Sequence, residues 1–390
     1  MIIPAADRLG KVEEYYFARK LREIRARDAA GEDIINLGIG NPDLMPATAT
    51  LKSLVHHAVE PGAHGYQPYK GIPQLREGFA SLYLNMYGVV LDAEAELLPL
   101  IGSKEGIMHI SMAFLNPGDQ VLVPNPGYLT YGSVSRLVGA ETVLYKLDEA
   151  HDWQPDFEAL EKQDLSRVKL MWVNYPHMPT GAPATDALME RLIAFGKKHQ
   201  ILICHDNPYS LVLNPHPKSI LAYEGARDVA IELNSLSKSH NMAGWRIGMV
   251  AGNAAYINLI LRVKSNMDSG MFQPLQRAAV EALALPFSWH KERNEEYAKR
   301  RVKIEELLTL LDCTFDANQV GMFVWARIPD HVKSGEAMSE EILNAARVFL
   351  TPGFIFGSQG ERYIRASLCN PLHRLDTALE RIRSFKMVGV

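Results

Sequence analysis

Short apolar runs alternate with amphipathic segments along the first two thirds of the chain. Seven of the apolar runs are predicted to be strands: residues 97–102, 120–124, 141–145, 168–174, 201–206, 229–235 and 247–252. Segments between them, such as 185–200, place apolar residues three and four positions apart, as an amphipathic helix does. Continuous apolar strands separated by such helices predict an α/β fold, with a mostly parallel sheet covered by helices on both faces.

The pattern changes after about residue 270. Long helical stretches follow there, and then two further strand-like segments at 321–328 and 361–368. This arrangement predicts a second, smaller α+β domain, which the N-terminal 45 or so residues join. We therefore expect a large domain over residues 46–284 and a small domain made of residues 1–45 and 285–390.

Composition excludes several classes of protein. Of 390 residues, 47% are hydrophobic and 22% are charged, which is typical of a soluble globular protein, and the net charge of −4 argues against a nucleic-acid binder. Cys204, Cys313 and Cys369 lie far apart without a CxxC pair, so we expect a reduced cytoplasmic protein with no metal site. No apolar stretch approaches 18 residues, and the first twenty residues carry charges where a signal peptide needs an apolar run, so we expect neither a signal peptide nor a membrane partner.

Polar residues gather where predicted strands end. Asp206 ends one strand, Ser235 ends the next and lies three residues before Lys238, and Gly102 and Ser103 lie where a third gives way to a helix. In open parallel sheets, ligands bind at the carboxyl ends of the strands. A buried aspartate at such a position needs a partner. Taken singly, each of these residues could equally be a helix cap or part of a salt bridge.

Together the same residues meet one chemical demand. A phosphorylated pyridine aldehyde needs a lysine to form a Schiff base and a carboxylate to keep its ring nitrogen protonated. Its phosphate needs backbone N–H groups at a helix N-terminus, hydroxyl groups and an arginine. In the segment SLSKSHNMAGWRIG (235–248), Lys238 suits the aldehyde, while Ser235 and Arg246 suit the phosphate.

The chain resembles the class I/II aminotransferases, which are pyridoxal 5′-phosphate enzymes of fold type I. Eight segments in the family's order provide the resemblance: NLGIGNPD (36–43), YQPYKGIPQLRE (66–77), GSKEGI (102–107), PNPGYLTY (124–131), NYPHMPTG (174–181), DNPY (206–209), SLSKSHNMAGWRIG (235–248) and YIRASL (363–368). Segments 102–107 and 264–279 resemble the branch that contains LL-diaminopimelate, alanine and aspartate aminotransferases. The resemblance implies that the large domain binds pyridoxal 5′-phosphate.

The resemblance also implies roles around the cofactor ring. Lys238 resembles the Schiff-base lysine, which then moves a proton between substrate Cα and cofactor C4′. Asp206 resembles the partner of the ring nitrogen, and Tyr209 the donor to the phenolic oxygen. Tyr128 resembles the aromatic residue that stacks on the ring, although a core tyrosine is the alternative.

A second group resembles the family's phosphate site. Its members in this chain are Gly102, Ser103, Lys104, Ser235, Ser237 and Arg246. Lys104 could instead be a solvated residue of the first helical turn. Tyr66 resembles the tyrosine that reaches the phosphate of the neighbouring subunit, which implies a homodimer with shared active sites.

For the substrate, the resemblance points to three residues. Arg365 resembles the arginine that pairs with the α-carboxylate, where a planar fork fits two parallel hydrogen bonds. Gly40 resembles the residue whose backbone lies over that carboxylate, and Tyr15 resembles a residue that closes over the substrate. The side chain of the substrate stays open, with glutamate and 2-oxoglutarate expected as one half of the pair.

One motif departs from the family pattern. Met178 stands where the family usually has an asparagine that bonds the ring oxygen, and a thioether cannot donate a hydrogen bond. Either Tyr209 acts alone at that oxygen, or His177 or Asn174 turns inward to help. The departure affects the tuning of the cofactor and leaves its binding intact.

Three functions use this set of residues. Ping-pong transfer of an amino group between an L-amino acid and a 2-oxo acid, in amino acid metabolism or biosynthesis, is the interpretation we favour. A C–S β-lyase of the cystathionase type would use the same lysine and aspartate. A regulator that binds the cofactor without turnover is the third, but such regulators append a DNA-binding domain, and we see no segment for one.

Overall fold

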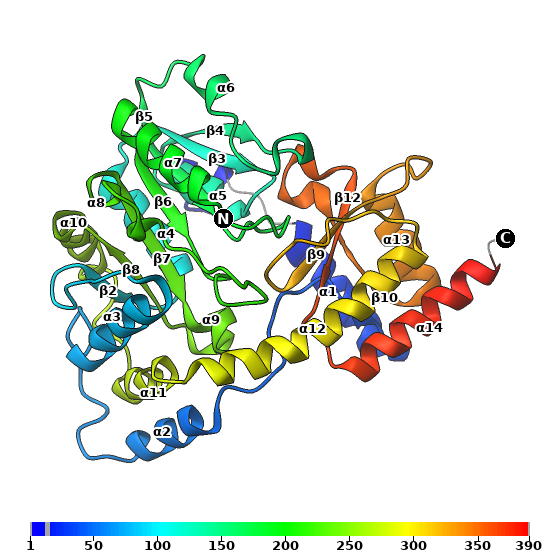
Figure 1. Cartoon of the computed structure of the whole chain (residues 1–390), viewed down its shortest axis with the longest axis horizontal. Coiled ribbons are helices and arrows are strands. Elements are labelled where there is room, and N and C mark those ends of the chain that lie inside the picture. Colours follow the sequence, from blue (N-terminus) through cyan, green and yellow to red (C-terminus); the bar gives the residue numbers. More distant parts are fainter. Residues whose placement is uncertain (1, 12–15, 389–390) are drawn as a thin grey trace.

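The structure is a computed structural model that describes residues 2–11 and 16–388. Figure 1 shows a larger body around a central sheet and a smaller body beside it, joined by the long helix α12 (Phe287–Leu310). Among the described residues, no helix is both long enough and apolar enough to cross a membrane.

The central sheet has seven strands in the order β2-β8-β7-β6-β5-β3-β4. In chain order they are β2 (Leu97–Leu100), β3 (Gln120–Asn125), β4 (Glu141–Lys146), β5 (Val168–Asn174), β6 (Leu202–Asp206), β7 (Ala230–Ser235) and β8 (Gly248–Gly252). Only β8 runs against its neighbours β2 and β7, so the prediction of a mostly parallel sheet is confirmed. Each strand lies within two residues of its predicted range.

Strand β5 explains why these strands form continuous apolar runs in the sequence. Leu170 and Trp172 pack into the hydrophobic cluster on one face of the sheet, whereas Met171 and Val173 pack into the cluster on the other. All four side chains are fully buried. Because successive side chains of a strand point to opposite faces, a sheet covered on both sides needs apolar residues at every position.

Helices cover both faces of the central sheet. One face is packed by α4 (Ser103–Phe114), α5 (Leu129–Leu137) and α10 (Ala254–Lys264). The other is packed by α3 (Pro73–Tyr87), α7 (Asp186–His199) and α11 (Gln273–Leu283). The predicted helix at 185–200 is thus α7, which begins after Thr185, whose hydroxyl accepts a hydrogen bond from the amide of Leu188.

The smaller body contains an antiparallel sheet in the order β11-β12-β9. Its strands are β9 (Phe323–Arg327), β11 (Thr351–Pro352) and β12 (Tyr363–Ser367), which confirms the two strands predicted near the C-terminus. A two-stranded parallel pair joins β1 (Ile35–Asn36) to β10 (Val348–Phe349). The N-terminal segment therefore packs with the last third of the chain.

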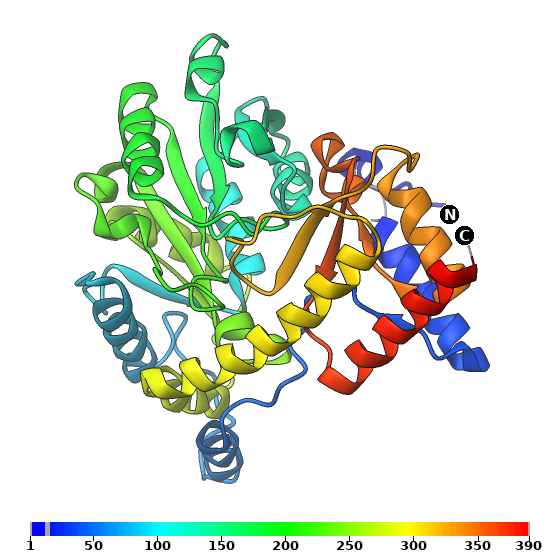
Figure 2. The same ribbon diagram turned by 45° about the vertical axis from the view of Figure 1, so that its right-hand side comes forward.

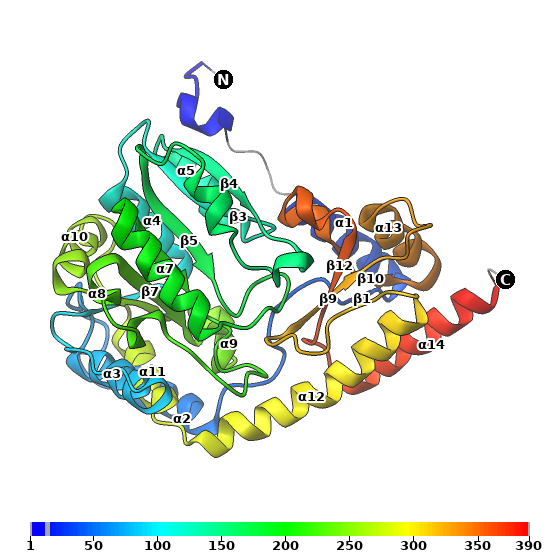
Figure 3. The ribbon, with the colours of Figure 1, turned by 45° about the horizontal axis from the view of Figure 1, so that its top comes forward.

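Further helices complete both bodies. The smaller body has α1 (Tyr16–Arg27), α13 (Gly335–Ala346) and α14 (Leu372–Val388). Figure 2 shows α14 lying beside α12, and Figure 3 shows the N-terminal turn η1 (Asp7–Lys11) standing apart from the smaller body. The remaining elements are η2 (Asp28–Glu32), α2 (Thr48–Ala58), η3 (Glu149–His151), α6 (Phe157–Glu161), η4 (Ile220–Ala222), α8 (Ala226–Val229), α9 (Leu236–Ser239), η5 (Ala243–Trp245), η6 (Gly353–Phe356) and η7 (Ser358–Gly360).

Candidate active site

The carboxyl ends of the parallel strands open into a cavity of about 420 Å³. Most of the site residues predicted from the sequence line it: Ser103, Lys104, Tyr128, Asp206, Tyr209, Ser235, Ser237, Lys238 and Arg246. They come from segments up to 143 positions apart in the chain (246 − 103). The fold therefore brings together side chains that the sequence could only group by type.

Asp206, the last residue of β6, lines this cavity. It is 4% exposed, and Tyr131 donates a hydrogen bond to its Oδ2 at 2.7 Å. Its Oδ1 has no hydrogen-bond partner among the described residues. Burial raises the pKa of Asp206 to about 6, against the opposing effect of the Tyr131 hydrogen bond. A buried carboxylate with one free oxygen is well suited to a cationic N–H donor, such as a protonated pyridine nitrogen.

Tyr131 was not predicted from the sequence as a partner of Asp206. The Tyr131 ring lies parallel to that of Trp172, with centroids 4.9 Å apart, and this contact orients its hydroxyl. Tyr131 follows Tyr128 by three residues, and their rings meet edge to face at 5.5 Å. That spacing, one helical turn within the segment PNPGYLTY, is the signal that could have identified it.

A cradle for an anion forms where α4 begins. The first amide N–H groups of a helix, here those of Ser103 and Lys104, have no intrahelical carbonyl to bond. Gly102 precedes them with a φ of 79°, and a Cβ placed there would lie 2.2 Å from Nη2 of Arg246. Glycine at this position therefore lets the guanidinium approach the start of the helix.

The hydroxyl groups beside Lys238 face the same cradle. Ser235 accepts a hydrogen bond from the amide of Ser237 at 3.1 Å and donates one to its hydroxyl at 2.9 Å. Arg246 donates to the Ser237 hydroxyl at 3.3 Å. Within the described part of the chain, no carboxylate forms an ion pair with Arg246. Two hydroxyls, an unpaired guanidinium and helix amides together match a phosphate dianion.

Lys238 lies on the short helix α9, between this cradle and the smaller body. Its Nζ donates a hydrogen bond to the carbonyl oxygen of Gly40 at 2.5 Å. Burial lowers the pKa of Lys238 to about 8, so that the neutral, nucleophilic amine is accessible near neutral pH. With the free oxygen of Asp206 and the anion cradle, this amine completes a set that fits a phosphorylated pyridine aldehyde.

Arg365 lines an adjoining cavity of about 340 Å³. Its guanidinium stacks over the rings of Phe323 and Phe356, at 3.9 and 4.6 Å from their centroids, and donates to the carbonyl oxygen of Gly38 at 2.8 Å. Its Nε is buried without a partner, and no described carboxylate forms an ion pair with it. Burial lowers its pKa to about 10. A buried, unpaired guanidinium is well suited to receive a ligand's carboxylate.

Gly40 lines the same cavity. A Cβ at this position would lie 2.2 Å from the Phe323 ring, so only a glycine fits there. Its carbonyl oxygen accepts from Lys238, which places the backbone between the lysine and the Arg365 cavity.

Met178 lies between the two cavities and lines both. Its Sδ is 3.2 Å from Nη1 of Arg365, and its amide donates to Oδ1 of Asn174 at 2.8 Å. Asn174 also donates to the carbonyl oxygen of Asp206, so its amide group is held by the backbone. His177 lines neither cavity and bonds Thr180 through Nδ1 at 2.8 Å. Of the three donors considered from the sequence, Tyr209 is the one that lines both cavities.

One predicted residue, Tyr66, lies outside both cavities, and another, Tyr15, is not described by the structure. Tyr66 is 93% exposed and lines neither cavity. Tyr15 lies outside the described residues.

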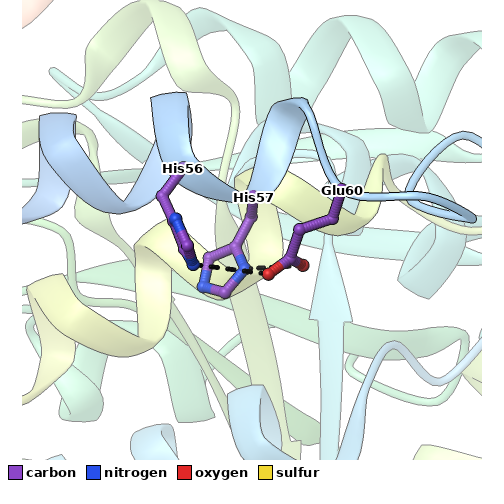
Figure 4. Close-up of side chains that lie close together, drawn as sticks. All are labelled: His56, His57 and Glu60. Carbon is purple, nitrogen blue, oxygen red and sulfur yellow. Dashed lines mark hydrogen bonds and ion pairs between the residues drawn. The ribbon is translucent and has the colours of Figure 1, made fainter.

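One group of potential metal ligands lies at the end of α2. Figure 4 shows His56, His57 and Glu60 close together, with Nδ1 of His57 2.9 Å from the Glu60 carboxylate. The side chain of His56 is 72% exposed. None of the three lines either cavity, so the group is separate from the site around Lys238.

Comparison with known proteins identifies relatives over nearly the whole chain. The model of the family aminotransferase class I and II matches residues 32–382. LL-diaminopimelate aminotransferase of Dehalococcoides mccartyi is 39% identical over 383 residues, covering 98% of both chains. The enzyme of that name from Nitratidesulfovibrio vulgaris is 41% identical over 382 residues, covering 97% of this chain and 98% of the relative. The substrate-bound BacF structure from Bacillus subtilis is 34% identical, with a TM-score of 0.94 and 98% coverage of both chains.

Proposed function

Since the chain belongs to the aminotransferase class I and II family, we propose that the two cavities form one active site with Lys238 at its centre. The protein is a pyridoxal 5′-phosphate-dependent aminotransferase, which exchanges an amino group between an amino acid and a 2-oxo acid. The strongest support for the proposed site is the buried Asp206 with one free oxygen, in the same cavity as Lys238.

When bound, the cofactor supplies an aldehyde that exchanges amino groups and a ring that accepts electrons. Asp206 would hold a proton on the ring nitrogen, with its carboxylate oriented by Tyr131. Burial raises the pKa of the Tyr209 hydroxyl and keeps it protonated, so it could donate to the ring's phenolic oxygen. Tyr128, which lines the same cavity, would pack against the face of the ring.

The cradle at the start of α4 would hold the phosphate. Its ligands would be the amides that follow Gly102, at Ser103 and Lys104, the hydroxyls of Ser235 and Ser237, and the guanidinium of Arg246. These groups anchor the cofactor at the end opposite Asp206. Lys238 would hold the aldehyde, and its Nζ, once the substrate's amine had replaced it there, would move a proton at substrate Cα.

Arg365 fixes the substrate for this transfer. Its fork receives the α-carboxylate beside the backbone of Gly40, which brings Cα toward Lys238. The same residues serve both half-reactions of a ping-pong exchange, since every amino acid and every 2-oxo acid presents the same carboxylate. The names of the relatives make LL-diaminopimelate one donor to test.

An assay with cystathionine separates transfer from β-elimination. The family assignment favours transfer, so we expect conversion of an amino acid only when a 2-oxo acid is present. A β-lyase would release pyruvate and ammonia from cystathionine without any 2-oxo acid. Steady release of pyruvate under those conditions, at a rate matching the best transfer rate, would overturn the proposed reaction.

Replacing Arg365 with lysine should weaken every amino acid substrate alike. Lysine keeps the charge but loses the planar fork, so the loss should be about 1.5–3 kcal/mol, the range for a hydrogen bond to a charged group. The measurement is kcat/KM for several amino donors, alongside the affinity for simple carboxylates. A loss confined to acidic donors would mean that Arg365 reads the side chain.

We propose that the enzyme is a homodimer with shared active sites. Tyr66 is 93% exposed in the single chain, in a segment rich in glycine and proline ahead of α3, and the family resemblance sends its hydroxyl to the partner's phosphate. Lys238→Ala and Tyr66→Phe variants, unfolded together and refolded, should then form mixed dimers that regain activity. Each mixed dimer has one site with both Lys238 and Tyr66 intact.

The control is each variant refolded alone under the same conditions. If Tyr66 serves its own chain, no mixed dimer contains an intact site, and the mixture should show only the summed activities of the separate variants. Sedimentation of the wild-type protein tests the dimer independently of the tyrosine.

We also propose the domain boundaries given by the sequence, with residues 46–284 binding the cofactor and residues 1–45 and 285–390 forming the small domain. The pairing of β1 with β10 supports the second part. A cytoplasmic location is proposed from three buried cysteines that lie far apart in the sequence without a CxxC pair.

A further inference from the structure

The cavity beside Arg365 continues into a region whose walls are almost wholly apolar. We call this region the apolar chamber and define it by six of its lining residues: Phe17, Leu21, Leu129, Phe323, Ile355 and Phe356. They come from four elements, α1, α5, β9 and η6. Phe17 and Leu21 are only half-buried, so they present apolar surface that a ligand could cover.

Charge is scarce along this cavity. Among its described lining residues, the charged side chains are Arg365 and Lys104, and no aspartate or glutamate is present. Arg365 is assigned above to the α-carboxylate. A substrate side chain that ends in an ammonium group would therefore meet no carboxylate in the part of the cavity that this chain builds, and burying it without a partner is unfavourable.

Contacts with α13 and η6 hold α1, and with it Phe17 and Leu21, beside the cavity. Phe17 and Leu21 are four residues apart and so lie on one face of the helix. The helix is tied to α13 by Lys20, whose Nζ lies 2.7 Å from Glu340, and by the Tyr16 hydroxyl, 3.2 Å from the same carboxylate. The Tyr16 ring also packs edge to face on Phe354 of η6 at 5.0 Å.

We propose that the apolar chamber receives the side chain of the amino acid substrate, and that the preferred donor has an aliphatic or aromatic side chain. This inference rests on the proposed function, because it needs Arg365 to hold the α-carboxylate. The rings of Phe323 and Phe356 line the chamber and also contact the anchoring group, because the guanidinium of Arg365 lies over both. The geometry thus places the side chain directly beside the group that anchors the substrate.

The first measurement is the equilibrium affinity of the holoenzyme for unreactive carboxylates, determined by calorimetry. From propanoate to pentanoate to heptanoate, affinity should rise by about fourfold for each methylene that enters the chamber. 3-Phenylpropanoate should bind more tightly than propanoate, and pimelate should bind more weakly than heptanoate. Affinity that is flat with chain length, or pimelate binding more tightly than heptanoate, would overturn the inference.

The second measurement compares two donors with the same carbon chain. LL-Diaminopimelate and 2-aminoheptanoate differ only in a distal amino group and a distal carboxylate, so their kcat/KM ratio isolates recognition of the far end. We expect 2-aminoheptanoate to be preferred by at least about tenfold, the lower end of what burying an unpaired polar group costs. A preference for LL-diaminopimelate would overturn this inference and leave amino transfer intact, whereas no turnover of any donor would overturn the proposed function itself.

Variants of Phe17 test the wall directly. Phe17→Asp should lower kcat/KM for phenylalanine by at least about tenfold and change that for alanine by less than about threefold, because alanine does not reach the chamber. Phe17→Leu keeps an apolar wall and should retain the preference for long side chains. Ala26→Asp places the same charge on an exposed position of α1 and is the matched control. Equal losses for phenylalanine and alanine would contradict the inference.

Discussion

The Lys238→Ala variant should lose amino transfer by at least about a thousandfold, because it removes the amine that we propose moves the proton at substrate Cα. The loss should appear in single-turnover reactions with a saturating amino donor, which exclude an effect on the second substrate. A small amine such as methylamine, added to the variant, should restore part of the rate. Lys52→Ala, which removes an exposed lysine far from the site in sequence, should keep full activity.

The pH dependence of cofactor attachment reports the same amine. Burial lowers the pKa of Lys238 to about 8, and only the neutral amine attacks an aldehyde. Attachment to the protein freed of cofactor should therefore accelerate about tenfold per pH unit below pH 8 and level off above it. Acceleration that continues to about pH 10.5 would mean that the lysine is solvated, as an ordinary surface lysine is.

The second large effect is expected at Asp206. Asp206→Asn keeps the size of the side chain and a partner for Tyr131, but it removes the negative charge that holds a proton on the ring nitrogen. We expect the single-turnover rate to fall by about 10² to 10⁴, with a smaller change in the affinity for the amino acid. The measurement is the rate at which a saturating donor loses its amino group.

Tyr131→Phe is the matched variant for that measurement. It keeps the carboxylate and the stacking on Trp172 but removes the hydrogen bond to Oδ2 of Asp206. Its rate should fall by no more than about tenfold, since the charge remains. Near-normal rates in Asp206→Asn would show that the carboxylate is a structural group at the end of β6.

The large body was predictable because its strands are buried on both faces. Leu170 to Val173 are apolar at consecutive positions, and beside amphipathic helices such a run is typical of a strand in a covered parallel sheet. Asp206 and Ser235 could be placed at the site for the same reason, since polar residues that follow such runs must lie at the carboxyl ends of the strands.

Contacts made by packing between distant segments could not be predicted in this way. The hydrogen bond from Tyr131 to Asp206 joins residues 75 positions apart, and the Arg365 contact with Met178 joins residues 187 apart. Nothing in the amphipathic pattern of α1 indicates that Phe17 reaches the substrate cavity, because an apolar helix face is equally suited to the core.

If Lys238 holds the cofactor, reductive trapping should attach the cofactor to that residue. The purified enzyme is saturated with pyridoxal 5′-phosphate, reduced with borohydride, digested and analysed by peptide mass spectrometry. We predict one phosphopyridoxyl group per chain, on the peptide that contains Lys238, and loss of the visible absorption band on reduction. Labelling of Lys104 instead, or no labelling after saturation, would contradict the account.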